Sequence, residues 1–317
     1  MTEQTTVEHE IVTTLIKERK RDRRWRNIRF FIWVILIVLV LVSVTNFTSK
    51  ISSLFSFGKQ ANTSKPYAAL VRLDGIIAPD KDLSANNIIP NLVMAFKDKE
   101  AKGVVLSMNC PGGSAVQSFI IHDKIVALKK KYHKKVIVVG EDVLASGGYL
   151  VAAAADEIYV NANTATGSIG VIMSGFGFTG AIKKLGITRR VFTAGDHKDR
   201  LDSFEPLVKG DVDKINRVLA QAHQNFIADV KQGRGGKLKA PDKMLFSGDF
   251  WNGEEATKLG LVDGTDNLWD VLKTRFNVEH YIDYSARPSF VQSILKNVQT
   301  ALDRHLIPSM QMQANAA

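Results

Sequence analysis

The chain has 317 residues and a formal net charge of +10, with 45% hydrophobic and 23% charged residues. This ordinary globular composition excludes a wholly disordered chain, and a single cysteine excludes an intrachain disulfide framework. Residues 17–29 hold eight Lys/Arg against two acidic residues, so most of the charge is local and no nucleic-acid partner is expected.

The first 66 residues predict a membrane anchor. Residues 30–47 carry no charge over 18 positions, which as a helix span roughly 27 Å, close to the hydrocarbon thickness of a bilayer. The basic segment 1–29 before them predicts a cytoplasmic N-terminus. A cleaved signal peptide is the alternative, but no A-x-A-like site follows Val44. We therefore expect a single-pass signal anchor in the cytoplasmic membrane, a linker at 48–66 and a domain on the external or periplasmic side.

Residues 67–275 alternate β-branched runs with helical patterns, which predicts an α/β domain with a largely parallel sheet. The expected strands are Ala68–Leu73, Val104–Met108, Lys135–Val139, Glu157–Val160 and Arg189–Thr193. The expected helices are Asn91–Lys99, Ser114–Lys131, Ser146–Ala155, 209–231 and Glu254–Leu259, with a basic glycine loop at Gly233–Lys237.

Residues 276–317 form a C-terminal extension. Within it, 288–307 is amphipathic, with apolar side chains such as Phe290 and Ile294 at every fourth position. This stretch could pack on its own domain, join subunits or lie on a membrane surface.

Three segments contain residue patterns that could form a catalytic site. Asn109–Gly113 ends one strand and opens a helix, and its two glycines could turn backbone N–H groups toward an anion, although Pro-Gly-Gly is also an ordinary turn. Ser146 follows another strand at a helix N-terminus, where it could be a nucleophile or a simple helix cap. Lys198 lies in a tight turn, where a solvated lysine is the ordinary alternative.

Together these segments predict a serine nucleophile, a lysine base and a backbone oxyanion hole. A lysine acts as a base only when neutral, so burial or nearby positive charge must lower its pKa. Arg200 is a candidate for that neighbouring charge.

An ordered set of motifs is similar to the signal peptide peptidase A family, whose members are membrane-anchored serine peptidases. The motifs are Asn109–Gly113, Ala145–Tyr149, Thr166–Val171, Gly195–Asp199, Trp251–Ala256 and Leu259–Asp263. The resemblance covers about residues 67–270 and implies the Clp protease/crotonase fold in its short, single-domain form.

The resemblance also implies roles for five residues. Ser146 would be the nucleophile, Lys198 the general base and Ser168 the residue that orients the lysine, while Gly113 and Gly147 would supply the oxyanion-hole amides. The family usually has serine where this chain has a cysteine at position 110, which raises a thiol nucleophile as an alternative. No histidine has a recognisable motif relation to that cysteine, so a small apolar substitute is the expected role.

The implied protein is a membrane-anchored endopeptidase that degrades remnant signal peptides and other membrane-associated or exported polypeptides. It would need no metal or organic cofactor. Its partners would be peptide substrates, the lipid bilayer and further copies of itself, because short members form rings or domes in which the serine and lysine can come from neighbouring subunits.

Other functions remain as alternatives. Gly175–Gly180 matches G-x-G-x-x-G, and Asp196 lies near the position of a ribose-binding acid, so a dinucleotide-binding oxidoreductase is one. A catalytically inactive membrane scaffold of the same fold is another. Acyl-CoA chemistry of the crotonase type rests on fold analogy alone.

Overall fold

The computed structural model describes Trp33 and residues 65–285. The expected anchor at 30–47, apart from Trp33, and the amphipathic stretch at 288–307 lie outside these residues. Among the helices that the structure describes, none combines the length and the apolar character needed to cross a bilayer.

A sheet with the strand order β6-β5-β3-β2-β1-β8 organises the domain, with β4 paired to β3 and β7 paired to β4. Every pairing is parallel except that of β5 with β6, which confirms the predicted α/β class with a largely parallel sheet. The strands are β1 (Tyr67–Asp74), β2 (Val104–Cys110), β3 (Val136–Ala145), β4 (Glu157–Val160), β5 (Ala165–Gly167), β6 (Phe250–Trp251), β7 (Gly264–Thr265) and β8 (His280–Asp283).

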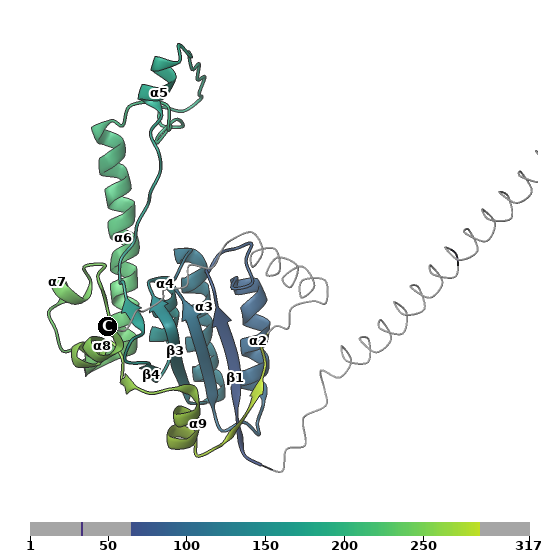
Figure 1. Ribbon diagram of the computed structural model, residues 1–317. Helices are drawn as coiled ribbons and strands as arrows, with labels where there is room; N and C mark the ends of the chain where they lie inside the picture. The colour runs from purple at the N-terminus through teal and green to yellow at the C-terminus, as the bar shows by residue number, and fades with distance from the viewer. Residues whose placement is uncertain (1–32, 34–64, 286–317) are drawn as a thin grey trace, which may run out of the picture. The chain divides into compact units, whose positions relative to one another are not determined.

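Helices cover both faces of the sheet (Figure 1). On one face lie α2 (Ala85–Lys97), α3 (Ala115–Tyr132) and α4 (Gly147–Ala153), whose apolar side chains join the main core. On the other lies α9 (Leu268–Phe276), which packs Val271 and Leu272 onto a smaller apolar cluster. Burial on both faces explains why β1 to β3 are almost continuously apolar in sequence.

A long helix, α6 (Lys209–Arg234), packs only its C-terminal half on α4, through Phe226 and Val230. Its N-terminal half and residues 170–208 extend away from the sheet, and we call them together the arm (Figure 1). The arm includes the short helix α5 (Thr179–Lys184), none of whose residues is buried. The short helices α7 (Asp242–Leu245) and α8 (Gly253–Leu259) follow α6.

Two expectations about local structure differ from the observed fold. The strand predicted at Arg189–Thr193 is wrong: these residues lie in the exposed arm in irregular conformation, since no neighbouring strand in the described chain can pair with them. In addition, β8 pairs in parallel with β1, so the sheet continues beyond residue 275, where the sequence placed the end of the domain.

Candidate active site

Ser146 joins β3 to α4 in a backbone conformation that L-amino acids rarely adopt, with φ 51° and ψ −125°. Its N–H donates to the carbonyl of Gly167 over 2.9 Å. Its side chain makes no capping hydrogen bond to α4, so Ser146 is not a simple helix cap. The residue is partly exposed and lies on a strained turn, as in the strand-to-helix turns that carry nucleophilic serines.

Two backbone amides lie beside Ser146. Gly113 has φ 143°, and its N–H has no hydrogen-bond partner within residues 65–285. The N–H of Gly147 is the first of α4, a position that has no intrahelical acceptor. A Cβ built on Gly147 would lie 3.4 Å from the Gly113 nitrogen and 2.3 Å from Ser118 Oγ. The structure thus brings Gly113, Gly147 and Ser146 together, with glycine required by space at position 147.

Ser168 also lies at this edge of the sheet. It follows β5, which pairs with β3 in the register Ala145 to Gly167, so Ser146 and Ser168 leave adjacent paired strands at the same level. Ser168 has φ 49°, and its N–H donates to the carbonyl of Asp249 over 2.7 Å. Both serines predicted for the site are therefore held by backbone hydrogen bonds at strand ends.

Cys110 is fully buried under the same turn. Its Sγ accepts the N–H of Gly112 over 3.4 Å and packs beside Gly148. Burial raises the pKa of the thiol to about 11, although the Gly112 N–H favours the thiolate and opposes this rise. A buried thiol that stays protonated at neutral pH is a poor nucleophile, which supports the role of a small apolar substitute.

Lys198 lies in the arm, in a turn closed by its own N–H and the carbonyl of Gly195, and its side chain is exposed. With Arg189 and Phe204, among other arm residues, it lines a shallow depression of about 380 Å³. Within the described residues, no hydrogen bond links Lys198 to Ser146 or Ser168. One chain thus places four of the five predicted site residues together and the fifth on a projecting segment.

Arg200 does not offer the free positive charge that the sequence suggested. Its Nε lies 2.8 Å from a carboxylate oxygen of Asp211, at the start of α6. This ion pair connects the loop that carries Lys198 to the start of α6, and it neutralises the guanidinium charge locally.

The glycine motif at 175–180 does not form a dinucleotide-binding turn. No strand leads directly into it, since residues 168–178 are irregular, and a Cβ on Gly175, Gly177 or Gly180 would meet nothing within 4 Å. A nucleotide-binding turn needs a strand before it and a helix packed closely behind. The structure therefore gives the oxidoreductase alternative no support.

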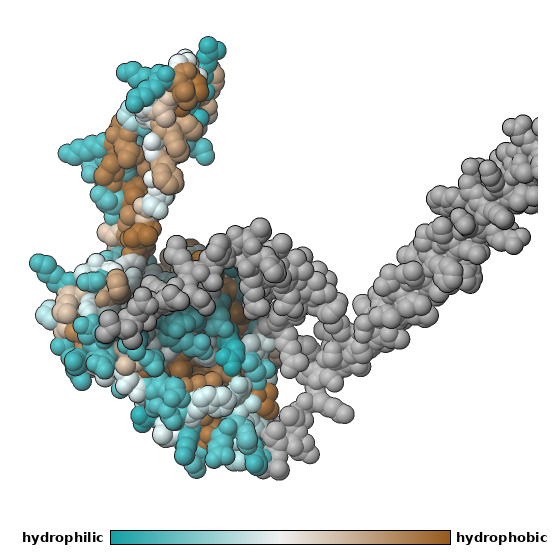
Figure 2. Space-filling view, in the orientation of Figure 1, coloured by the Kyte–Doolittle hydropathy of each residue, from teal (hydrophilic) through white to brown (hydrophobic). Residues whose placement is uncertain are grey.

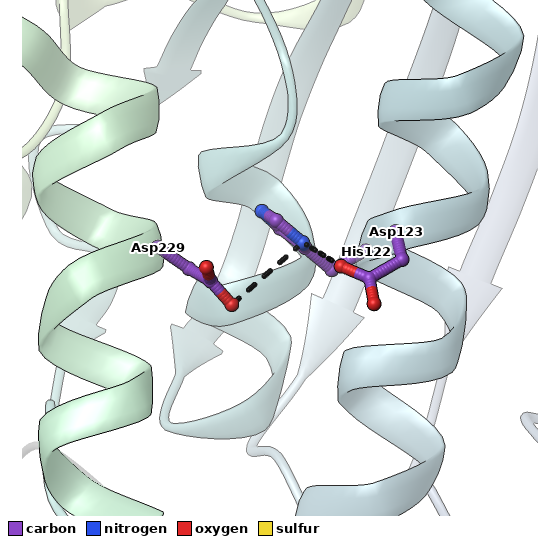
Figure 3. Close-up of side chains that lie close together, drawn as sticks. All are labelled: His122, Asp123 and Asp229. Atoms are coloured by element: carbon purple, nitrogen blue, oxygen red, sulfur yellow. Dashed lines mark hydrogen bonds and ion pairs between the residues drawn. The ribbon is translucent and has the colours of Figure 1, made fainter.

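A His–Asp cluster lies between α3 and α6 (Figure 3). Nδ1 of the buried His122 lies 2.9 Å from a carboxylate oxygen of Asp123 and 4.0 Å from one of Asp229. Burial raises the pKa of Asp229, as does Asp123, while His122 opposes the rise. Three ligand atoms within 4.8 Å of one another could hold a cation, and the contact of His122 with Asp229 also joins α3 to α6.

The C-terminal end of α6 is fixed by a buried arginine that the sequence did not single out. Arg234 closes α6 instead of lying in the predicted basic loop, and its side chain is 1% exposed. One guanidinium nitrogen lies 2.7 Å from Asp263, and two others donate to the carbonyl of Gly260. The spacing of Phe226, Val230 and Arg234 on one helical face is the signal that could have found it.

Two family models match overlapping parts of the chain. The model described as Peptidase family S49 matches residues 128–278, and the Clp protease model matches residues 59–169. Their overlap, 128–169, contains Ser146, Gly147 and Ser168, so both models include the serine turn.

Three curated proteins are similar to parts of this chain. A stretch of 186 residues is 45% identical to a Brucella melitensis protein named Na(+)/H(+) antiporter NhaA, covering 58% of this chain and 25% of that protein. A candidate protease of Methanocaldococcus jannaschii is 35% identical over 200 residues, 63% of each chain. A candidate signal peptide peptidase of Enterococcus faecium is 33% identical over 177 residues, 56% of this chain and 51% of that protein. The chain thus spans less than two thirds of the length of each of these relatives, and only a quarter of the length of the antiporter.

Proposed function

The chain belongs to the signal peptide peptidase A family, and we propose that it is a serine endopeptidase in which Ser146 and Lys198 form the catalytic dyad. The observation that carries the proposal is the strained Ser146 beside the first N–H of α4 and the N–H of Gly113, which has no acceptor within residues 65–285. A partly exposed serine next to two backbone donors is the arrangement that acyl transfer requires.

The first half of the proposed reaction forms an acyl-enzyme. The Ser146 hydroxyl passes its proton to the neutral Nζ of Lys198, while Oγ attacks the carbonyl carbon of the scissile peptide bond. The N–H groups of Gly113 and Gly147 stabilise the negative charge that develops on the carbonyl oxygen. As the C–N bond breaks, Lys198 returns the proton to the leaving amine.

The second half releases the acyl group. Lys198, neutral again, takes a proton from a water molecule, whose oxygen attacks the ester carbonyl in the same oxyanion site. The Ser146–acyl bond then breaks and Oγ regains the proton from Lys198, which restores the starting state. No metal or organic group enters this sequence.

We infer that Lys198 reaches Ser146 of a neighbouring subunit. Lys198 is exposed on the arm, which also exposes large apolar side chains: Ile172 is 90%, Phe176 80% and Phe192 92% exposed. Figure 2 shows hydrophobic residues on the surface of the arm. A monomer rarely leaves so much apolar surface in water, so packing against another copy would cover it. The same packing would remove Lys198 from water.

The proposed substrates are remnant signal peptides and other membrane-associated or exported polypeptides. The uncharged segment 30–47 supports a membrane anchor, which would hold the catalytic domain at the external surface of the cytoplasmic membrane. Apolar signal peptides concentrate at that surface, so the anchor would bring enzyme and substrate together.

Cleavage of an apolar, signal-peptide-like substrate by the full chain in detergent tests the proposal. We expect turnover by the wild type and by Cys110→Ser, and loss of at least about 10³-fold in kcat for Ser146→Ala and Lys198→Ala, because each removes an essential half of the dyad. Oligomeric state is recorded for all four chains. Undiminished cleavage by Ser146→Ala would contradict the assignment, and cleavage lost in Cys110→Ser alone would point to the thiol.

A further inference from the structure

The base of the arm is the place where the chain leaves the sheet-containing body and returns to it. The chain leaves after Ile169, which is fully buried, and residues 172–178 are all exposed. It returns along α6, where His223, Phe226 and Val230 lie on one helical face against the body. Residues 209–222 of α6 include no buried position. His223 is therefore the first residue of α6 with a hydrogen bond to the body.

One side-chain hydrogen bond joins the two ends of this base. The imidazole Nε2 of His223 lies 3.1 Å from the carbonyl oxygen of Ile169. A carbonyl oxygen only accepts, so Nε2 carries a hydrogen and donates it. The bond connects residues 54 positions apart in sequence: Ile169 at the end of the body before the arm, and His223 where α6 returns to the body. It thus restrains the direction in which the arm leaves the body.

The acceptor, Ile169, lies next to Ser168, in a short segment that we call the strip 168–170. The N–H of Ser168 donates to the carbonyl of Asp249, and a Cβ on Gly170 would lie 3.0 Å from the Cα of Gly248. The strip 168–170 is therefore in contact both with the segment 248–249 and with His223. A displacement of His223 would move the end of this strip that connects to the arm.

We propose that His223 is a positioning residue for the dyad: it fixes the base of the arm and so sets where Lys198 is presented, while it holds the strip beside Ser146. This inference rests on the proposed function, since it assigns His223 to the same reaction. His223 touches neither substrate nor reacting atoms. Its contribution is the hydrogen bond to Ile169, which an amide donor of similar reach can replace.

Kinetics test this role with three variants of the full chain. His223→Ala removes the donor, His223→Gln retains an N–H donor on a side chain of similar length, and Gln224→Ala is the matched control on an exposed neighbouring position. We expect His223→Ala to lower kcat by about 10- to 100-fold, because small misplacements of a catalytic group carry losses of that size. KM should stay near the wild-type value, His223→Gln should recover most of kcat, and Gln224→Ala should match the wild type. Equal losses in His223→Ala and His223→Gln, or unchanged kcat in both, would overturn the proposal.

A distance measurement tests the same role without relying on activity. Spin labels at Lys184→Cys on α5 and Lys130→Cys on α3, in a Cys110→Ser background, report the distance between arm and body. Labelled chains are diluted with unlabelled chain, so that each distance lies within one subunit. We expect one narrow distribution in the wild-type background and in His223→Gln, and a broadened or shifted one in His223→Ala. An unchanged distribution in His223→Ala would overturn the arm-fixing role, whereas failure of the proposed function would appear separately, as cleavage retained by Ser146→Ala.

Discussion

Ser146→Gly is expected to abolish cleavage and at the same time to stabilise the fold. Loss of the nucleophile should lower kcat by about 10⁴- to 10⁶-fold, as found when a catalytic serine is removed from other peptidases. The backbone at this position has φ 51° and ψ −125°, a region that glycine occupies without penalty. Relief of that strain is worth roughly 1–3 kcal/mol, less the ~0.5–1 kcal/mol that glycine's larger unfolded-state entropy costs.

The matched control is Ser146→Ala, which loses the hydroxyl but keeps the Cβ and therefore the strain. Unfolding by denaturant should give a higher free energy of unfolding for Ser146→Gly than for Ser146→Ala, by up to about 2.5 kcal/mol. A lower free energy of unfolding for Ser146→Gly than for Ser146→Ala would show that Ser146 is unstrained. A fold that stores strain at its nucleophile is expected where the site is selected for activity at the expense of stability.

Asp263→Ala should destabilise the domain by about 3–5 kcal/mol, because it leaves the buried Arg234 guanidinium without its counter-ion. Arg234 is 1% exposed and bonds only to Asp263 and Gly260 among the described residues. The carboxylate of Asp263 also accepts the N–H of Ile158 over 2.8 Å, so its loss disturbs β4 as well. The free energy of unfolding measured in urea checks the size of the effect.

Lys237→Ala is the control for that substitution. Lys237 lies 2.7 Å from the other carboxylate oxygen of Asp263, but its side chain is 42% exposed, so its removal should cost no more than about 1 kcal/mol. An equal loss of unfolding free energy in both variants would show that the buried pair of Asp263 with Arg234 stabilises the domain no more than the exposed pair with Lys237.

The ion pair also predicts acid sensitivity. Burial alone would raise the pKa of Asp263, but hydrogen bonds from Arg234, Lys237 and Ile158 outweigh it and hold that pKa below its usual value. A lowered folded-state pKa gives stability that is complete above the unfolded value of about 3.9 and is lost as the pH falls through the folded value. Asp263→Ala should therefore flatten the fall in stability below pH 4, and an unchanged slope would contradict this.

The sequence predicted the sheet and the serine turn because both rest on local patterns. Apolar runs marked β1 to β3, and residues at the carboxyl ends of paired parallel strands meet at one edge, which brought Ser146, Ser168 and Gly113 together. The glycine at position 147 was identified from its motif, whereas the structure explains it by a non-local contact, the closeness of Ser118 on α3 to α4. The order of the motifs therefore predicted most of the residues around Ser146.

The parts that the sequence missed depend on long-range packing. The pattern at Arg189–Thr193 is that of a strand, but a strand needs a partner, and the arm offers none among the described residues. Arg234 and His223 lie on a helix whose contacts with Asp263 and Ile169 connect residues 29 and 54 positions apart. No spacing rule within a segment of sequence predicts such contacts.

Mixing two inactive chains tests the central claim most directly, namely that Ser146 of one subunit is served by Lys198 of the next. Ser146→Ala and Lys198→Ala are each purified, dissociated, mixed in equal amounts and reassembled, and cleavage is compared with that of wild type treated in the same way. In a ring of head-to-tail contacts, random mixing pairs an intact serine with an intact lysine at about one quarter of the sites. Recovery near that level is the predicted result, and a mixture as inactive as its two components would contradict the account.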